Sequence, residues 1–318
     1  MNQSRAALAA IATLIPLAMI ATIYTGRSAL QDRQEQEKIT VVASFYPLYE
    51  FASRVIGDRG EVSSLVPVGI EPHDWEPTAE DVSRVRAADV LVINGAGFER
   101  WADDIGAKVV ANTSEGIEFN YKEGKIVGDD DEQHRHGDVA SGGVNPHIWL
   151  DPILAKHQID KIRNVMASSD PANADYYNQN ADKFMAELNS LDAFIRSELA
   201  DCDKSDFITF HDAFIYFSER YGLRQHSIHG ISPEGEILPQ TMQQIIELAN
   251  KLDINVIYSE DLIDSRLADT IANEIPSGKV LVLSPIEGID KEEQAAGIGY
   301  INKMKQNIAN LKEGLECK

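Results

Sequence analysis

Three histidines stand where loops meet predicted strands and helices, and each is of a type that can bind a metal. His73 lies in the loop Glu-Pro-His-Asp-Trp-Glu-Pro-Thr after a predicted strand, and His147 lies in Asn-Pro-His-Ile-Trp-Leu-Asp-Pro just before a predicted helix. His211 directly follows the apolar run Phe-Ile-Thr-Phe. Neutral imidazole is a common ligand of transition metals. The gaps of 74 and 64 residues between them match no compact metal motif, and any one histidine is more often an ordinary packed or surface residue.

Alternating strands and helices would bring these loops to one side of a sheet. In the first half, the helix at Thr78 begins with a capping box completed by Asp81. Open α/β sheets bind ligands beyond the carboxyl ends of their strands, where the loops of His73 and His211 begin. The expected strands of the first series are 39–45, 61–67, 89–94 and 108–112, with a helix at 48–56.

A long helix separates this series from a second one. Within 171–200, apolar residues recur at steps of three and four, which is typical of a single buried helical face (Phe184, Leu188, Leu191, Ile195 and Leu199). The second series has predicted strands at 207–210, 255–259 and 279–283, and helices at 212–221, 239–252, 265–275 and 293–315. The predicted class is α/β, with two lobes of mainly parallel, four-stranded sheets joined by one long rigid helix. The expected boundaries are an N-terminal segment 1–37, lobes at 38–168 and 202–318, and the joining helix at 169–201.

The N-terminus and the two cysteines indicate a location outside the cytoplasm. The stretch Ala6–Tyr24 carries no charge and follows Arg5, which fits a cleaved export signal, an uncleaved membrane tether or, less readily, a buried core helix. Cys202 and Cys317 could form a disulfide in an oxidising compartment, or they could be two unrelated thiols.

The charge balance excludes one class of partner. With 51 acidic and 29 basic residues, the formal net charge is −22, so nucleic acid is not expected as a partner. The acidic stretch 129–143 contains His134 and His136 and has too few apolar residues to order itself by burial. It fits either a solvated flexible loop or a weak auxiliary metal collector.

Four segments and the closing helix together resemble a known family. The segments are 72–78, 145–152, 210–221 and 230–236, and the helix carries Tyr300, Met304, Asn307 and Leu311. They are similar to the zinc- and manganese-binding solute-binding proteins of ABC importers, over essentially all of residues 39–318. The resemblance implies a metal cleft between the lobes, with His73 and His147 from the first lobe and His211 from the second. It also implies an ABC permease and its ATPase as partners, and a monomer that is no enzyme.

The residues at two positions indicate the zinc branch of this family. Manganese-selective relatives typically have a carboxylate where His211 stands, and imidazole suits zinc better than the harder manganese ion. Many relatives have an Asp ligand where this chain has Ser284. In a zinc-binding branch, however, a segment like Leu283–Glu287 supplies a glutamate, so Glu287 is the predicted fourth ligand of Zn²⁺. Water at the fourth position stays open as the alternative, and Glu260 is the next candidate ligand, although it is expected rather to stabilise a helix start or a neighbouring loop.

The remaining polar and aromatic residues near these motifs have supporting roles in this interpretation. His157, His226 and His229 are expected to be structural or exposed. Trp75 and Trp149 are expected to pack beneath the site, and the candidate acceptors for imidazole N–H groups are Asp74, Asp151 and Asp212. A manganese or iron homologue is the alternative function. A zinc hydrolase is less favoured because no catalytic motif is present, and an adhesive role does not explain the ligand set.

Overall fold

The computed structural model describes residues 38–119, 125–126, 144–233 and 237–318. Strands of the first series form a sheet in the order β2-β1-β3-β4. Its strands are β1 (Ile39–Ala43), β2 (Gly60–Ser64), β3 (Val90–Ile93) and β4 (Val110–Asn112). The pairs β1–β3 and β3–β4 are parallel, with Val41 opposite Val90 and Leu91 opposite Val110. The predicted α/β class is confirmed.

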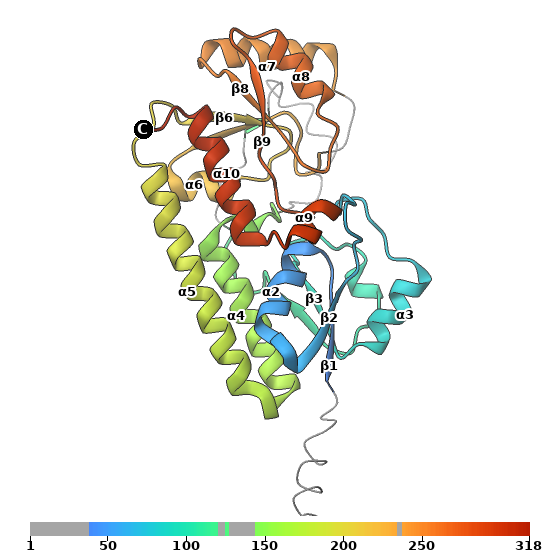
Figure 1. Cartoon of the computed structure of the whole chain (residues 1–318). Helices are drawn as coiled ribbons and strands as arrows, with labels where there is room; N and C mark the ends of the chain where they lie inside the picture. The colour runs from blue at the N-terminus through green and yellow to red at the C-terminus, as the bar shows by residue number, and fades with distance from the viewer. Residues whose placement is uncertain (1–37, 120–124, 127–143, 234–236) are drawn as a thin grey trace, which may run out of the picture. The chain divides into compact units, whose positions relative to one another are not determined.

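Helices cover both faces of this sheet. On one face lie α2 (Tyr46–Ile56), α4 (Pro152–Ser169) and α5 (Ala174–Glu198), while α3 (Ala79–Ala87) lies on the other (Figure 1). Helix α3 begins at Thr78 with the predicted capping box, in which Thr78 and Asp81 satisfy each other's backbone N–H groups. Short 3-10 turns complete this half: η1 (Gly57–Arg59), η2 (Ala102–Asp104), η3 (Ile148–Leu150) and η4 (Pro171–Asn173).

The second sheet has five strands where four were predicted. Its order is β5-β7-β6-β8-β9. The additional edge strand is β5 (Lys125–Ile126), which comes from the first half of the sequence and pairs in parallel with β7 (Arg224–Ser227). The other strands are β6 (Asp206–Thr209), β8 (Val256–Ser259) and β9 (Lys279–Val282), and the helices of this half are α6 (Ile215–Tyr221), α7 (Pro239–Lys251) and α8 (Arg266–Asn273).

Two helices connect the half of the fold that contains the first sheet to the half that contains the second. Helix α5 buries the predicted stripe Phe184, Leu188, Leu191 and Ile195, while Leu199 at its C-cap is only half-buried. The closing segment is a second connection, since the ring of Tyr300 lies 5.1 Å from that of Phe51 in α2 and the carbonyl of Asn310 accepts a 3.0 Å hydrogen bond from Tyr258 in β8. Residues 40–318 form one compact unit. The lobe boundaries at 168 and 201 stay a prediction.

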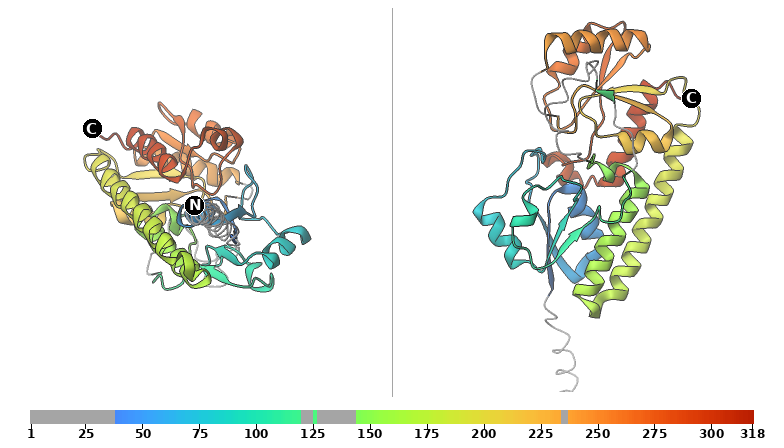
Figure 2. Two further views of the ribbon diagram at one scale, coloured as in Figure 1. Left: turned by 60° about the horizontal axis from the view of Figure 1, so that its bottom comes forward. Right: turned by 180° about the vertical axis from the view of Figure 1, so that it is seen from behind.

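The closing helix predicted at 293–315 is wrong in one respect, because it is two helices. Helix α9 (Lys291–Ala296) ends at Gly297, which has a left-handed φ of 67°, and α10 (Tyr300–Gly314) begins after Gly299. A Cβ atom at Gly299 would lie 2.9 Å from a carboxylate oxygen of Glu50, so glycine permits the close approach of α2. Figure 1 shows α10 running beside the second sheet toward the first, and Figure 2 shows the same elements from two further directions.

The structure contains the disulfide considered for the two cysteines. It links Cys202, in the segment after α5, to Cys317, in the segment after α10. Among the helices of the described residues, none has the length and apolar character needed to cross a membrane. The segment 1–37 and the loop 129–143, with His134 and His136, lie outside the described residues.

Candidate metal centre

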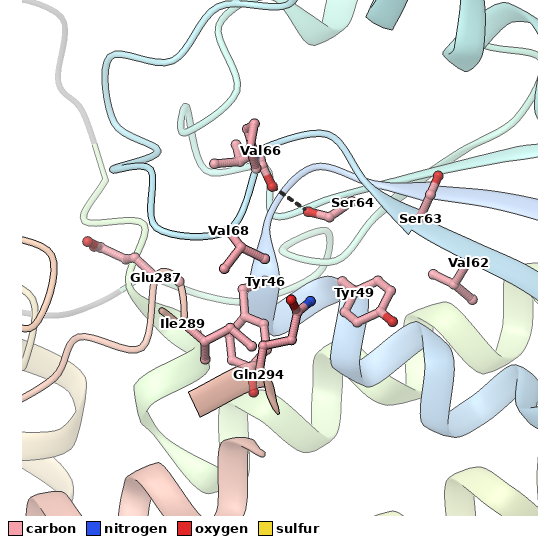
Figure 3. Close-up of a pocket in the computed structure, with 12 residues that line it drawn as sticks. Tyr46, Tyr49, Val62, Ser63, Ser64, Val66, Val68, Glu287, Ile289 and Gln294 are labelled. Atoms are coloured by element: carbon pink, nitrogen blue, oxygen red, sulfur yellow. Dashed lines mark hydrogen bonds between the residues drawn. The ribbon is translucent and has the colours of Figure 1, made fainter. Parts of the chain in front are cut away.

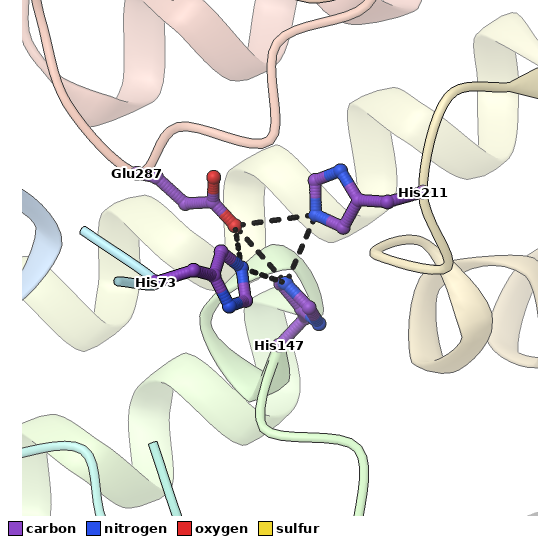
Figure 4. Close-up of side chains that lie close together, drawn as sticks. All are labelled: His73, His147, His211 and Glu287. Carbon is purple, nitrogen blue, oxygen red and sulfur yellow. Dashed lines mark hydrogen bonds and ion pairs between the residues drawn. The ribbon is translucent and has the colours of Figure 1, made fainter. Parts of the chain in front are cut away.

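Four side chains from four separate loops converge between the two sheets (Figure 4). His73 lies in the loop between β2 and α3, and His147 directly precedes η3. His211 follows β6, and Glu287 follows β9. One potential ligand atom from each of these residues lies within 4.8 Å of the others. The structure therefore brings together the four residues that the sequence predicted as zinc ligands.

The separations between the potential ligand atoms fit a small tetrahedral ion. Oε1 of Glu287 lies 3.0 Å from Nε2 of His73, 3.0 Å from Nε2 of His147 and 3.3 Å from Nε2 of His211. Nε2 of His147 lies 3.2 Å from that of His73 and 3.1 Å from that of His211. Ligands about 2.0–2.1 Å from a tetrahedral zinc ion would lie about 3.3–3.4 Å apart. Five of the six edges are therefore close to this size, and the sixth, between His73 and His211, is at most 4.8 Å.

The centre is shielded from solvent and two of its rings are already oriented. The side chains of His147 and His211 are fully buried, Glu287 is 1% exposed and His73 is 7% exposed. Nδ1 of His147 lies 2.8 Å from Oδ1 of Asn145, and Nδ1 of His211 lies 2.7 Å from Oε1 of Glu260. When Nδ1 carries the proton and donates it to these acceptors, Nε2 is left as the metal-binding atom.

The sequence interpretation of these acceptors was wrong. Asp151 is the N-cap of α4 and pairs with Arg220, and Asp212 contacts the amide of Asn145, so neither accepts from His147 or His211. Asp74 is exposed on the His73 loop. Glu260 was considered as a ligand or as support for a nearby loop. Its Oε1 accepts from the backbone N–H of His211 over 3.2 Å and lies 2.7 Å from Nδ1 of the ring, so it supports the His211 loop and is not a member of the cluster. Its place directly after β8 was the one local signal for this role.

Burial and charge act in opposite directions on the two buried imidazoles. Burial lowers the pKa of His147 to about 3, which keeps this ring neutral at ordinary pH. Burial by itself would also lower the pKa of His211, but the carboxylates of Glu260 and Glu287 raise it well above its usual range. Burial would raise the pKa of Glu287, but the three histidines lower it well below its usual range. The arrangement thus favours an ionised carboxylate among imidazoles, as a metal requires.

Aromatic rings pack around the histidines. Trp149 is fully buried, its ring lies 5.0 Å from that of His147, and its indole N–H donates to the carbonyl of Pro285 over 2.7 Å. This confirms the packing role predicted for Trp149. The corresponding prediction for Trp75 is wrong, because Trp75 packs against Trp101 in the core of the first sheet. The ring beside His73 is that of Phe98, at 5.0 Å, which the sequence interpretation missed.

The other described histidines lie outside the cluster. Nε2 of His157 lies 2.9 Å from the carbonyl oxygen of Glu115, and that of His226 lies 2.9 Å from a carboxylate oxygen of Asp206. His229 is partly buried on the loop after β7, and burial lowers its pKa. Ser284 donates to Asp261 over 2.7 Å and is not part of the cluster. These positions agree with the structural roles predicted for them.

A cavity of about 270 Å³ reaches the Glu287 segment from the side of α2 (Figure 3). Its lining includes Tyr46, Tyr49, Ser64 and Gln294, together with Glu287 and Gly288. In Figure 3 the carboxylate of Glu287 points away from the other labelled residues. The cavity therefore lies behind the ligand segment and not among the potential ligand atoms.

Comparison with known proteins assigns the family. Residues 41–314 match the model of the family described as "Zinc-uptake complex component A periplasmic". The chain belongs to this family. Members of the zinc-uptake component A family are binding components of zinc transport and not enzymes, which confirms the zinc branch and the non-enzymatic function predicted from the sequence. The manganese or iron alternative and the hydrolase are not favoured.

Curated relatives carry the same zinc description. The chain is 38% identical over 292 residues to the high-affinity zinc uptake system protein ZnuA of Bacillus subtilis, covering 89% of each protein. It is 32% identical over 287 residues to the zinc-binding protein AdcA of Streptococcus pyogenes, where it covers 86% of this chain but only 56% of AdcA. AdcA thus has a further part with no counterpart in this alignment.

Solved structures share the fold. The metal-dependent lipoprotein YcdH of Bacillus subtilis matches with a TM-score of 0.74 and 36% identity, covering 87% of this chain and 99% of that one. The Zn(II)-bound ZnuA-like domain of Streptococcus pneumoniae AdcA matches with a TM-score of 0.74 and 29% identity, covering 88% and 99%. The laminin-binding protein Lmb of Streptococcus agalactiae, described as an adhesin and metal transporter, matches with a TM-score of 0.76 and 28% identity, covering 88% and 100%.

Proposed function

We propose that this chain binds one Zn²⁺ ion through Nε2 of His73, His147 and His211 and a carboxylate oxygen of Glu287, and delivers it to an ABC permease driven by its ATPase. The observation that carries the proposal is the buried set of three imidazole nitrogens and one carboxylate oxygen, in which five of the six separations are 3.0–3.3 Å and all atoms lie within 4.8 Å of one another. This ligand set suits zinc, because imidazole nitrogen and carboxylate oxygen are both frequent zinc ligands.

The ion is cargo in this proposal and not a catalyst. Catalytic zinc sites keep an open position for water or substrate, whereas here the carboxylate of Glu287 closes a four-ligand set. The second oxygen of Glu287 is buried and has no hydrogen-bond partner among the described residues. A cation would compensate for this buried, unpaired oxygen. The protein acts outside the cytoplasm as a monomer, and the segment 1–37 is either its export signal or its tether.

The proposal is tested by metal content and by the position of the ion. Purified protein loaded with zinc should contain one ion per chain, and anomalous scattering at the zinc edge should locate it among His73, His147, His211 and Glu287. Replacing His211 by Ala should weaken zinc binding far more than deleting residues 129–143. An ion bound elsewhere, or equal losses in the two variants, would contradict the assigned site.

A further inference from the structure

The five residues from Asn145 to Trp149 contact the segments of two other potential ligands. His147 is the central residue of this stretch, and both outer side chains reach loops that follow strands of the second sheet. Asn145 contacts the residue directly after His211, while Trp149 contacts the residue two positions before Glu287. The contacts therefore extend outward from one ligand to the neighbours of two others.

Asn145 uses the two ends of its amide for different ligands. Its oxygen lies 2.8 Å from Nδ1 of His147 and also accepts from the backbone N–H of His147 over 3.1 Å. Its Nδ2 donates to the carbonyl oxygen of Asp212 over 2.5 Å. An amide can accept at one end and donate at the other, whereas a carboxylate only accepts. Asn145 therefore joins the loop of His211 to the ring of His147 in a way that aspartate would not.

Two further contacts join the segment of His147 to the helix that follows His211. The carbonyl of Asn145 accepts a hydrogen bond from the hydroxyl of Tyr216 in α6, the helix that follows His211. Arg220, one turn further along α6, pairs with Asp151 just beyond Trp149. The His211 loop and its helix are thus fixed to the segment of His147 at several points.

Trp149 and Gly69 hold the Glu287 segment from both sides. The indole N–H of Trp149 donates to the carbonyl of Pro285, two residues before Glu287. The backbone N–H of Gly69, in the loop that carries His73, donates to the carbonyl of Ile289 over 3.0 Å, two residues after Glu287. Between these anchors Ile286 is buried with a φ of 55°, a conformation that a β-branched residue adopts only when its surroundings impose it.

We propose that Asn145 and Trp149 are positioning residues that preset the metal geometry: Asn145 places His211, and Trp149 places Glu287, both relative to His147. The inference rests on the proposed function and deepens it. Partners that orient metal ligands commonly contribute about 10- to 100-fold to metal affinity, so losses of this size are expected when either contact is removed.

The test uses two variants, each of which removes the hydrogen-bond donor of one side chain and keeps its approximate shape. Asn145→Asp keeps an acceptor for His147 but replaces the donor to the Asp212 carbonyl by an oxygen. Trp149→Phe keeps an aromatic ring beside His147 but removes the donor to the Pro285 carbonyl. Matched controls are Asn189→Asp, at an exposed position of α5, and Trp101→Phe, at a partly buried position packed against the first-sheet core. Zinc affinity is measured by competition with a chromophoric chelator, and the melting temperature of the metal-free protein is recorded for each variant.

Double-mutant cycles separate positioning from general loosening. Each positioning variant should weaken zinc binding at least 10-fold in the wild-type background, while both controls leave it within about 2-fold. Asn145→Asp should cause little further loss once His211 is Ala, but its full loss once Glu287 is Ala. Trp149→Phe should show the reverse dependence.

The outcomes distinguish this inference from the function on which it rests. If the wild-type protein binds no zinc, the proposed function itself fails. If it binds zinc but the variants match it, or if their losses are the same in every background, the positioning roles are wrong. If the variants lose melting temperature in proportion to affinity and show no pairwise dependence, the two side chains only stabilise the fold.

Discussion

At the scale of single residues, the site combines imidazoles in unlike surroundings. His147 has a neutral amide as its Nδ1 partner, whereas His211 has the carboxylate of Glu260. A carboxylate partner raises the basicity of a ligating imidazole. Burial lowers the pKa of His147, and Glu260 and Glu287 outweigh burial to raise that of His211. In the metal-free protein, the raised pKa of His211 consequently favours a proton on this ring, with which an incoming ion competes.

This difference predicts a pH dependence of zinc binding. Zinc and protons compete for Nε2 of His211, so zinc affinity should fall as the pH is lowered from about 7.5 to about 5. One displaced proton changes the apparent dissociation constant by about 10-fold per pH unit. Calorimetry in two buffers of different ionisation enthalpy would measure the affinity and the protons released. An affinity that is constant over this range would be inconsistent with the four-ligand assignment.

At the scale of elements, a disulfide links the C-terminal ends of the two helices α5 and α10, just before β6 begins. The disulfide joins Cys202 to Cys317, and two backbone hydrogen bonds flank it, from Lys204 to Leu315 over 3.0 Å and from Lys318 to Asp201 over 2.9 Å. The bridge spans 115 residues of sequence. Without the bridge, the unfolded chain regains the conformational entropy of this long loop, which favours unfolding.

Replacing both cysteines by serine should therefore lower stability without removing the metal ligands. The chain-entropy model gives about 4–5 kcal/mol for a loop of this length, and measured losses for native disulfides are commonly about 2–5 kcal/mol. Urea unfolding of the metal-free double variant and of the wild-type protein would give the difference. The same unfolding with a reducing agent is the control, because the two proteins should then agree. A double variant as stable as the oxidised wild type would show that the bridge contributes nothing.

Elements with a periodic apolar pattern were predictable from the sequence, and those without one were not. The apolar stripe of α5 and the apolar run of β3 are visible in the sequence because these residues are buried in the fold. Strand β7, Arg-Gln-His-Ser, has no such signal because its polar residues find partners such as Asp206 only in the folded sheet. The break at Gly297 was also missed: the six residues of α9, Lys291–Ala296, bury no side chain, so no apolar pattern separates them from α10.

The residues of the candidate site also divide into those that the sequence predicted and those that it did not. The four potential ligands were found because their motifs resemble those of a family. The acceptors that face the imidazoles were not identified, because the hydrogen bond between His211 and Glu260 joins residues 49 positions apart, and the place of Glu260 after β8 does not show which ring it faces. Three aspartates within four residues of a candidate ligand were chosen instead, and proximity in sequence proved a poor guide to which acceptor faces an imidazole.

At the scale of the whole molecule, the four candidate ligands lie where the segments of both sheets meet. His73 and His147 belong to loops associated with the first sheet, and His211 and Glu287 follow strands of the second. An ion bound to all four would add cross-links between these segments that the unfolded chain cannot make. Binding that favours only the folded state stabilises it by mass action.

Zinc should consequently raise the melting temperature of the wild-type protein. At a free zinc concentration about 100 times the dissociation constant, the gain is about 2.7 kcal/mol. For a domain of this size, that corresponds to roughly 5–10 °C, since about 1 kcal/mol shifts the melting temperature by about 2–4 °C. Scanning calorimetry with buffered zinc and then with excess chelator would measure the gain and its reversal. The His211→Ala variant should gain far less at the same free zinc concentration, because it offers the ion one ligand fewer. An equal gain in that variant would mean that zinc stabilises the protein from another site.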